Sequence, residues 1–241
     1  MESNSALRLI KVLDKLKGAN ANTPIAKVIK EIFNDDEESR IGVHIGQIFT
    51  LSNTVHKQVL ALPDFDPDVD LQWMPGVYAG LSTLSVKGNV NNFREAYPLE
   101  VRAFLLGAAR NLGKHFPDLS IDSEQLKNIY EEISPLIDQL LEDRDIDQTL
   151  KNFILDKLRL IQDVIVNSSV VGFSELVTHV ESAYAGTIFR VGGVENVQTA
   201  KKKSEILANF IDWLGRTLIL LEAGKIGYLG ISTIARFLLE G

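Results

Sequence analysis

The residues best suited to catalysis or metal binding in this chain are its four histidines, His44, His56, His115 and His179. An imidazole can act as a general base or a zinc ligand near neutral pH when its partners lie close by. His44 and His56 share a predicted helix, but a separation of twelve residues places them roughly 120° apart around its axis. The His-Glu-x-x-His pattern of zinc proteases is missing. We interpret the histidines as packing or surface residues, with a site assembled from distant parts of the chain as the alternative.

Aspartates at alternate positions, a spacing typical of calcium loops, occur in two runs, Asp64–Asp70 and Asp143–Asp147. A calcium loop also needs a glycine at its sixth position and a glutamate at its twelfth. In the first run these positions hold Val69 and Pro75, and the second run fails at the same two places. The alternative is that Asp66 caps a helix whose first turn carries further carboxylates, which the helix dipole favours. We expect capping, and no metal site.

Other sequence signatures of catalysis are also missing. The chain has no cysteine, which excludes disulfides, thiolate catalysis and cysteine-bound zinc. Gly192-Gly193 lies near Lys201 without the Gly-Lys-Ser/Thr of a phosphate-binding loop, and no Gly-x-Ser-x-Gly hydrolase motif occurs. We assign no catalytic residue and no cofactor, and the balance of these observations is against an enzyme.

The charge of the chain limits its partners. The net charge of −7 over 241 residues argues against a general nucleic-acid binder, which usually carries a basic surface. Six basic and four acidic residues over 196–241 give this end +2, leaving −9 for residues 1–195. The first five residues, Met-Glu-Ser-Asn-Ser, lack the basic and apolar regions of a secretory signal, and we expect a cytoplasmic protein.

The C-terminal segment is the most apolar part of the chain. Two predicted helices, 196–223 and 227–240, follow one another and are separated near Gly224. They are interpreted as core, as an interface with a partner or second copy, or as a membrane-active pair. Each arm has about fifteen apolar-rich residues, short of the roughly 20 that cross a bilayer. The residues expected at a partner or membrane surface are Lys201, Lys202, Lys203, Phe210, Trp213, Leu229 and Phe237.

The sequence pattern indicates helices throughout the chain. We predict an all-α multi-helix bundle of about nine to ten helices. Apolar side chains recur at helical spacing, and no run of alternating strands is found. Residues 122–167 show two amphipathic stretches around a short polar turn, which predicts an antiparallel helical hairpin. We expect a helical region at 1–116 and another at 122–241, or one continuous domain.

Two expectations concern the middle of the N-terminal region. One helix is predicted from Asp66 to Leu81 with a kink at Pro75, and a loop or an irregular connection is predicted for residues 87–97. The bulky residues Trp73, Met74 and Tyr78 lie on that helix. We interpret them as core, with a groove for a partner peptide as the functional alternative.

Together these observations favour a non-catalytic cytoplasmic adaptor or regulatory protein that acts through protein–protein contacts. A protein partner or a homo-oligomer is expected. The alternative is a membrane-active effector that uses the apolar C-terminal pair, with basic residues at its start meeting anionic lipid.

Overall fold

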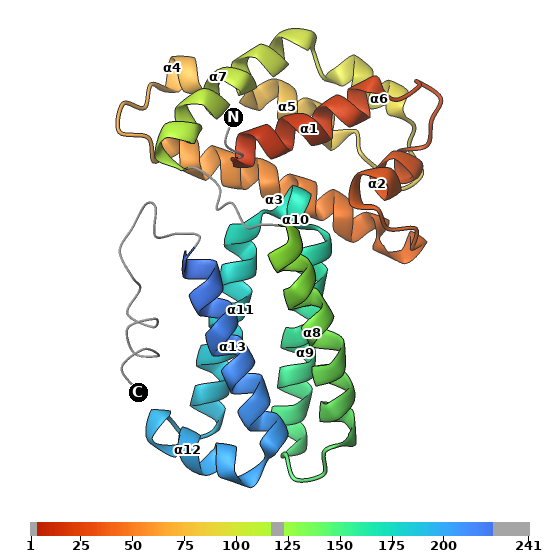
Figure 1. Cartoon of the computed structure of the whole chain (residues 1–241). Helices are drawn as coiled ribbons and strands as arrows, with labels where there is room; N and C mark the ends of the chain where they lie inside the picture. The colour runs from red at the N-terminus through yellow and green to blue at the C-terminus, as the bar shows by residue number, and fades with distance from the viewer. Residues whose placement is uncertain (1–3, 117–122, 224–241) are drawn as a thin grey trace. The chain divides into compact units, whose positions relative to one another are not determined.

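The computed structural model describes residues 4–116 and 123–223, and these residues form an all-α fold, as predicted. The chain divides into two compact units, each with its own apolar core. Unit 1 contains residues 1–118 and 169–172, and unit 2 contains residues 119–168 and 173–241. Figure 1 shows the helices of both units.

Unit 1 is built around its first helix, α1, which contacts α2, α3, α6 and α7. Asn4 caps α1, because its side chain accepts a hydrogen bond from the backbone N–H of Leu7 at 3.0 Å. Leu9, Leu13 and Leu16 recur along α1 and are fully buried. The helices of the unit are α1 (Ser5–Gly18), α2 (Ile25–Phe33), the 3₁₀ turn η1 (Glu38–Arg40), α3 (Ile41–Leu60), α4 (Pro67–Asp70), α5 (Met74–Ser82), α6 (Val90–Ala96) and α7 (Leu99–His115).

Two local predictions for unit 1 were wrong. The helix expected from Asp66 to Leu81 is divided into α4 and α5, and Pro75 stands in the first turn of α5. Proline lacks a backbone N–H, so it fits the start of a second helix better than the interior of one. The predicted loop at 87–97 contains the helix α6, which Asn89 caps by accepting from the N–H of Asn91. Asn89, one of the asparagines that favour a loop, is therefore the cap of a short helix.

Residues 169–172 complete unit 1 from a distant part of the sequence. They include most of α10 (Ser168–Val171), and Val170 is buried in the core of unit 1. The buried guanidinium of Arg8 donates from Nε to the backbone carbonyl of Val170 at 3.2 Å. Burial lowers the pKa of Arg8 to about 10, so the group stays charged at neutral pH. Gly172 has a φ of 91°, and a Cβ there would collide with the Arg8 side chain.

Unit 2 is a bundle in which the long helices form a closed ring of contacts: α8 with α9, α9 with α11, α11 with α13, and α13 with α8. Helices α8 and α9 lie side by side at the place of the predicted hairpin (Figure 1). The turn after α11 contains Gly192 and Gly193 with φ near 93° and 98°, a conformation that favours glycine. The helices of the unit are α8 (Ser123–Glu142), α9 (Gln148–Val166), α11 (Phe173–Arg190), α12 (Val194–Lys203) and α13 (Glu205–Ala223).

The first arm of the predicted C-terminal pair is two helices, α12 and α13, separated at Ser204. The Ser204 hydroxyl accepts from the N–H of Leu207 at 3.1 Å and donates to Asp143 at 3.0 Å, so it caps α13. The second arm, 227–240, lies outside the described residues. Among the described helices, none is both long enough and apolar enough to cross a membrane.

Candidate functional site

A cleft of about 1500 Å³ runs along α13 in unit 2 and is the candidate functional site. Helix α13 contributes residues from Asn209 to Ile219, one wall comes from α8, and the other comes from α11 and α12. Two apolar side chains in the lining are open to solvent, Phe189 at 81% exposure and Ile219 at 38%. An apolar cleft between helices of a bundle is a common place for a ligand or partner segment.

Charged groups of both signs border this cleft. The Lys201 ammonium forms an ion pair with the Asp212 carboxylate at 2.5 Å, and Glu132 and Arg216 also belong to the lining. The indole N–H of Trp213 is buried and has no hydrogen-bond acceptor among the described residues. The cleft therefore combines apolar contact area with flanking charges, a composition that suits an amphipathic polypeptide more than a small charged metabolite.

The surface residues predicted from the sequence are divided by the structure. Lys201 lines the cleft. Trp213 also belongs to the lining, but its side chain is buried in the core of unit 2, as is that of Phe210. Lys202 is exposed on α12. The side chain of Lys203 and the residues Leu229 and Phe237 lie outside what the structure describes.

The structure places Trp73, Met74 and Tyr78, which were interpreted as core with a partner groove as the alternative, in or against the packed helices of unit 1. Trp73 is fully buried in the core of unit 1, and Met74 packs against that core. The half-buried Tyr78 donates its hydroxyl to Asn53 on α3. These residues act as core and as a tie between α5 and α3, which is the other interpretation of their helical spacing.

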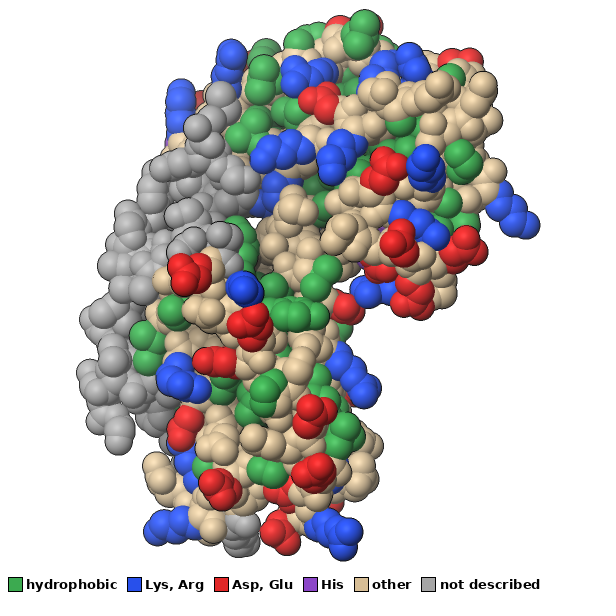
Figure 2. Space-filling model, turned by 45° about the vertical axis from the view of Figure 1, so that its right-hand side comes forward, with side chains coloured by type: hydrophobic (Ala, Val, Ile, Leu, Met, Phe, Trp, Pro, Cys, Tyr) green, Lys and Arg blue, Asp and Glu red, His purple; other side chains and the backbone are tan. Residues whose placement is uncertain are grey.

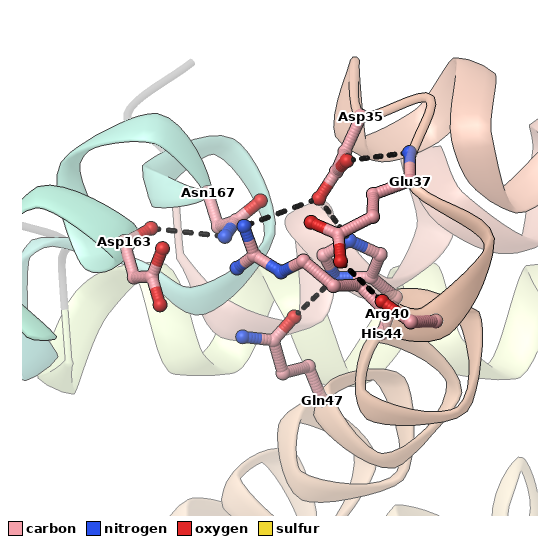
Figure 3. Close-up of polar contacts among 8 residues, drawn as sticks. Asp35, Glu37, Arg40, His44, Gln47, Asp163 and Asn167 are labelled. Atoms are coloured by element: carbon pink, nitrogen blue, oxygen red, sulfur yellow. Dashed lines mark hydrogen bonds and ion pairs between the residues drawn. The ribbon is translucent and has the colours of Figure 1, made fainter.

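A polar cluster around His44 was not predicted (Figure 3). The His44 ring is fully buried, stacks on Phe33 at 4.1 Å between ring centroids, and has both nitrogens engaged. Nε2 lies 2.9 Å from Asp35 Oδ2, and Nδ1 lies 3.0 Å from Gln47 Oε1. Arg40 also pairs with Asp35 at 3.3 Å. Because neither ring nitrogen is open to a substrate, the cluster has a structural role.

The cluster acts on the protonation of Asp35. The backbone N–H of Glu37 donates to Asp35 Oδ1 at 2.9 Å, and this bond, followed by that from His44, holds the pKa of Asp35 below its usual value. The sequence signal for the cluster was weak: His44 and Asp35 are nine residues apart and belong to different elements. Only the folding of the α2–α3 connection brings them together.

Both aspartate runs cap helices. Asp66 accepts from the N–H of Asp68 at 3.0 Å, and Asp70 accepts in return from the N–H of Asp66 at 2.9 Å. In the second run, Asp147 caps α9. Burial tends to raise the pKa of Asp143, but hydrogen bonds led by those from the backbone N–H groups of Asp145 and Ile146 lower it further than burial raises it. Within residues 4–116 and 123–223, no group of three or more histidine and carboxylate side chains is arranged to hold a metal ion.

The visible face of each unit carries acidic and basic side chains interspersed with apolar ones (Figure 2). Comparison of the chain with models of known protein families, with curated protein sequences and with solved structures gave no match. The cleft and its chemistry are therefore the basis for a functional proposal.

Proposed function

We propose that the protein is a non-catalytic adaptor or regulatory protein whose unit 2 binds an amphipathic helix of a partner protein in the cleft along α13. The observation that supports this most directly is the apolar lining around the 81% exposed Phe189. Covering a phenylalanine side chain with an apolar partner is worth about 1.5–3 kcal/mol. A large exposed aromatic in a concave surface is the kind of residue that dominates binding energy in protein interfaces.

The partner's chemistry follows from the lining. The apolar face of the partner helix covers Phe189 and Ile219, and the flanks of that helix carry charges of both signs to meet Glu132 and Arg216. Helix-in-groove binding uses anchors at i, i+3 or i+4, and i+7. On α13, the lining residues Asp212, Arg216 and Ile219 follow that same spacing and present one continuous helical stripe.

A displayed library of amphipathic helical peptides, selected against the full chain, tests the proposal. Peptides with apolar residues at i, i+3 and i+7 are expected to be enriched. Phe189→Asp should weaken their binding at least tenfold, because a carboxylate would be desolvated in an apolar contact. The matched control is Leu160→Asp, which places the same charge on an exposed apolar position of α9 outside the cleft lining. Binding to this variant should remain within twofold.

Two results would contradict the proposal: no enrichment of helical sequences, or binding that survives Phe189→Asp unchanged. Flotation of the full chain with vesicles of anionic phospholipid, without peptide binding, would instead favour the membrane-active effector.

A further inference from the structure

We infer that unit 1 carries a second interaction surface, the exposed face of α7, and that this face binds the same face of a second copy of the chain in an antiparallel pair. The surface lies in unit 1, whereas the cleft belongs to unit 2. The inference therefore goes beyond the proposed function and stands or falls independently of it.

Helix α7 has a buried side and an exposed side. It packs against α1, α3, α4 and α5, and Leu105, Ala109 and Leu112 are buried in the core of unit 1. The other side is a face of exposed residues at helical spacing: Glu100, Ala103, Phe104, Gly107, Asn111 and Lys114. Phe104 is 41% exposed, at a position where a surface helix normally carries a polar side chain. The middle of this face is small or apolar, and its two ends are charged.

Gly107, at the centre of the face, permits the close approach of another helix. Glycine in the interior of a helix is destabilising relative to alanine. A Cβ at Gly107 would have no neighbour within 4 Å outside its own helix, so the packing inside unit 1 does not require a glycine there. Its missing side chain leaves a hollow on the helix surface, next to the exposed ring of Phe104, into which a side chain of a second helix can pack.

The charged ends favour a second copy as the partner. Glu100 lies seven residues before Gly107, and Lys114 lies seven residues after it. A two-fold axis at Gly107 therefore brings Glu100 of each copy beside Lys114 of the other, so two ion pairs form. A parallel arrangement would instead oppose like charges at both ends. In the antiparallel pair, Phe104 packs over Gly107 of the second copy, so the hollow and the exposed ring complement each other.

A single helix face makes a small interface, so we expect a reversible dimer. Sedimentation equilibrium of the full chain, between roughly 10 and 500 µM, should show the mass rising from one chain towards two. Because exposed ion pairs are screened by salt, the dimer should weaken in about 1 M NaCl. A chain that stays monomeric over this range at low salt would overturn the inference.

Charge reversal tests the pairing of the two ends. Glu100→Lys and Lys114→Glu each replace both attractive pairs by like charges, and each should weaken the dimer at least tenfold. Mixing the two variant chains should restore dimerisation to within threefold of the unsubstituted chain, because both ends then join opposite charges. The control is Lys57→Glu, at an exposed position of α3, which should leave the dimer unchanged. Weak dimers that are not restored by mixing would contradict the antiparallel pairing.

Single cysteines test the position of the two-fold axis, since the chain has no cysteine of its own. Gly107→Cys lies on the axis, and mild oxidation should link two chains by a disulfide, seen by non-reducing electrophoresis. Asn111→Cys lies on the same face, but antiparallel pairing separates it from its counterpart by about 12 Å along the helix. A disulfide needs Cα atoms within about 7 Å, so this control should link at least tenfold less. Equal linking of both variants, or of neither, would overturn the inference.

Phe189→Asp separates this surface from the cleft. It should abolish the binding of helical peptides and leave the dimer intact. Loss of the dimer in this variant would overturn the inference, because the cleft of unit 2 would then be the dimer interface. If peptide selection fails while the mixed charge variants still dimerise, the adaptor function is wrong and the α7 surface stands.

Discussion

Asp35 shows how one carboxylate fixes the connection between α2 and α3 in unit 1. It accepts from the backbone of Glu37, contacts the buried His44 ring and pairs with Arg40. Its pKa lies below the usual value, which means that the ionised carboxylate is stabilised more in the folded state than in the unfolded chain. Stability from this group is therefore present above the unfolded pKa of about 4 and is lost as pH falls through the lower folded value.

Asp35→Asn should lower the free energy of unfolding by about 1.5–3 kcal/mol at pH 7, the usual worth of hydrogen bonds to a charged group. The difference from the unsubstituted chain should shrink as pH falls below 4, because protonation removes the same charge. Urea unfolding at a series of pH values between 2.5 and 7 measures this. Asp36→Asn, at the exposed neighbouring position, is the control and should change stability by less than about 0.5 kcal/mol. A difference that is constant with pH would contradict this electrostatic explanation.

At the scale of the helices, the sequence predicted best where one residue caps one helix. Asp66 was expected as a cap and acts as one, since capping depends only on neighbouring residues. The helix α6 was missed because it has only seven residues, and its apolar contacts come from elsewhere in unit 1. The cleft was missed for a similar reason. The sequence shows that Phe189 and Ile219 are apolar. Whether their side chains stay exposed depends on how α8, α11 and α13 pack against one another.

Ser204 is the residue that separates α12 from α13, and its hydroxyl also holds the α8–α9 turn through Asp143. Ser204→Ala should lower the free energy of unfolding of unit 2 by about 1–2 kcal/mol, because the N–H of Leu207 and the half-buried carboxylate of Asp143 both lose a partner. Thr178→Ala, on the exposed side of α11, is the control and should stay within about 0.5 kcal/mol. In a Trp73→Phe background, the fluorescence of Trp213 during urea unfolding gives both values. Equal effects of the two substitutions would mean that the Ser204 cap does not stabilise the boundary between α12 and α13.

At the scale of the whole molecule, there are two cores and one tryptophan in each. Trp73 is buried in unit 1 and Trp213 in unit 2, and the chain has no other tryptophan. The sequence predicted helical regions at 1–116 and 122–241, or one continuous domain, and it did not indicate that residues 169–172 join the first core, because both cores use the same apolar residues at the same spacing. Separate cores predict separate cooperative unfolding.

Leu158→Ala, at a fully buried position of α9, should destabilise unit 2 by about 2–5 kcal/mol. In a Trp73→Phe background, the urea midpoint followed by Trp213 should fall, whereas in a Trp213→Phe background the midpoint followed by Trp73 should move far less. Leu9→Ala in α1 should give the reverse pattern. Coincident shifts of both probes for both substitutions would show that the chain unfolds as one cooperative body.

The late contribution of Val170 to the core of unit 1 has a consequence for how the protein is made. During synthesis, the first 118 residues leave the ribosome without the segment that accepts the Arg8 hydrogen bond. That segment arrives about 50 residues later, which takes roughly 3–10 s at ribosomal speeds of about 5–20 residues per second. Helices α8 and α9 of unit 2 are translated in the interval. The N-terminal unit therefore reaches its final form only after α8 and α9 have been synthesised, and a fragment that ends before residue 169 lacks part of the core of unit 1.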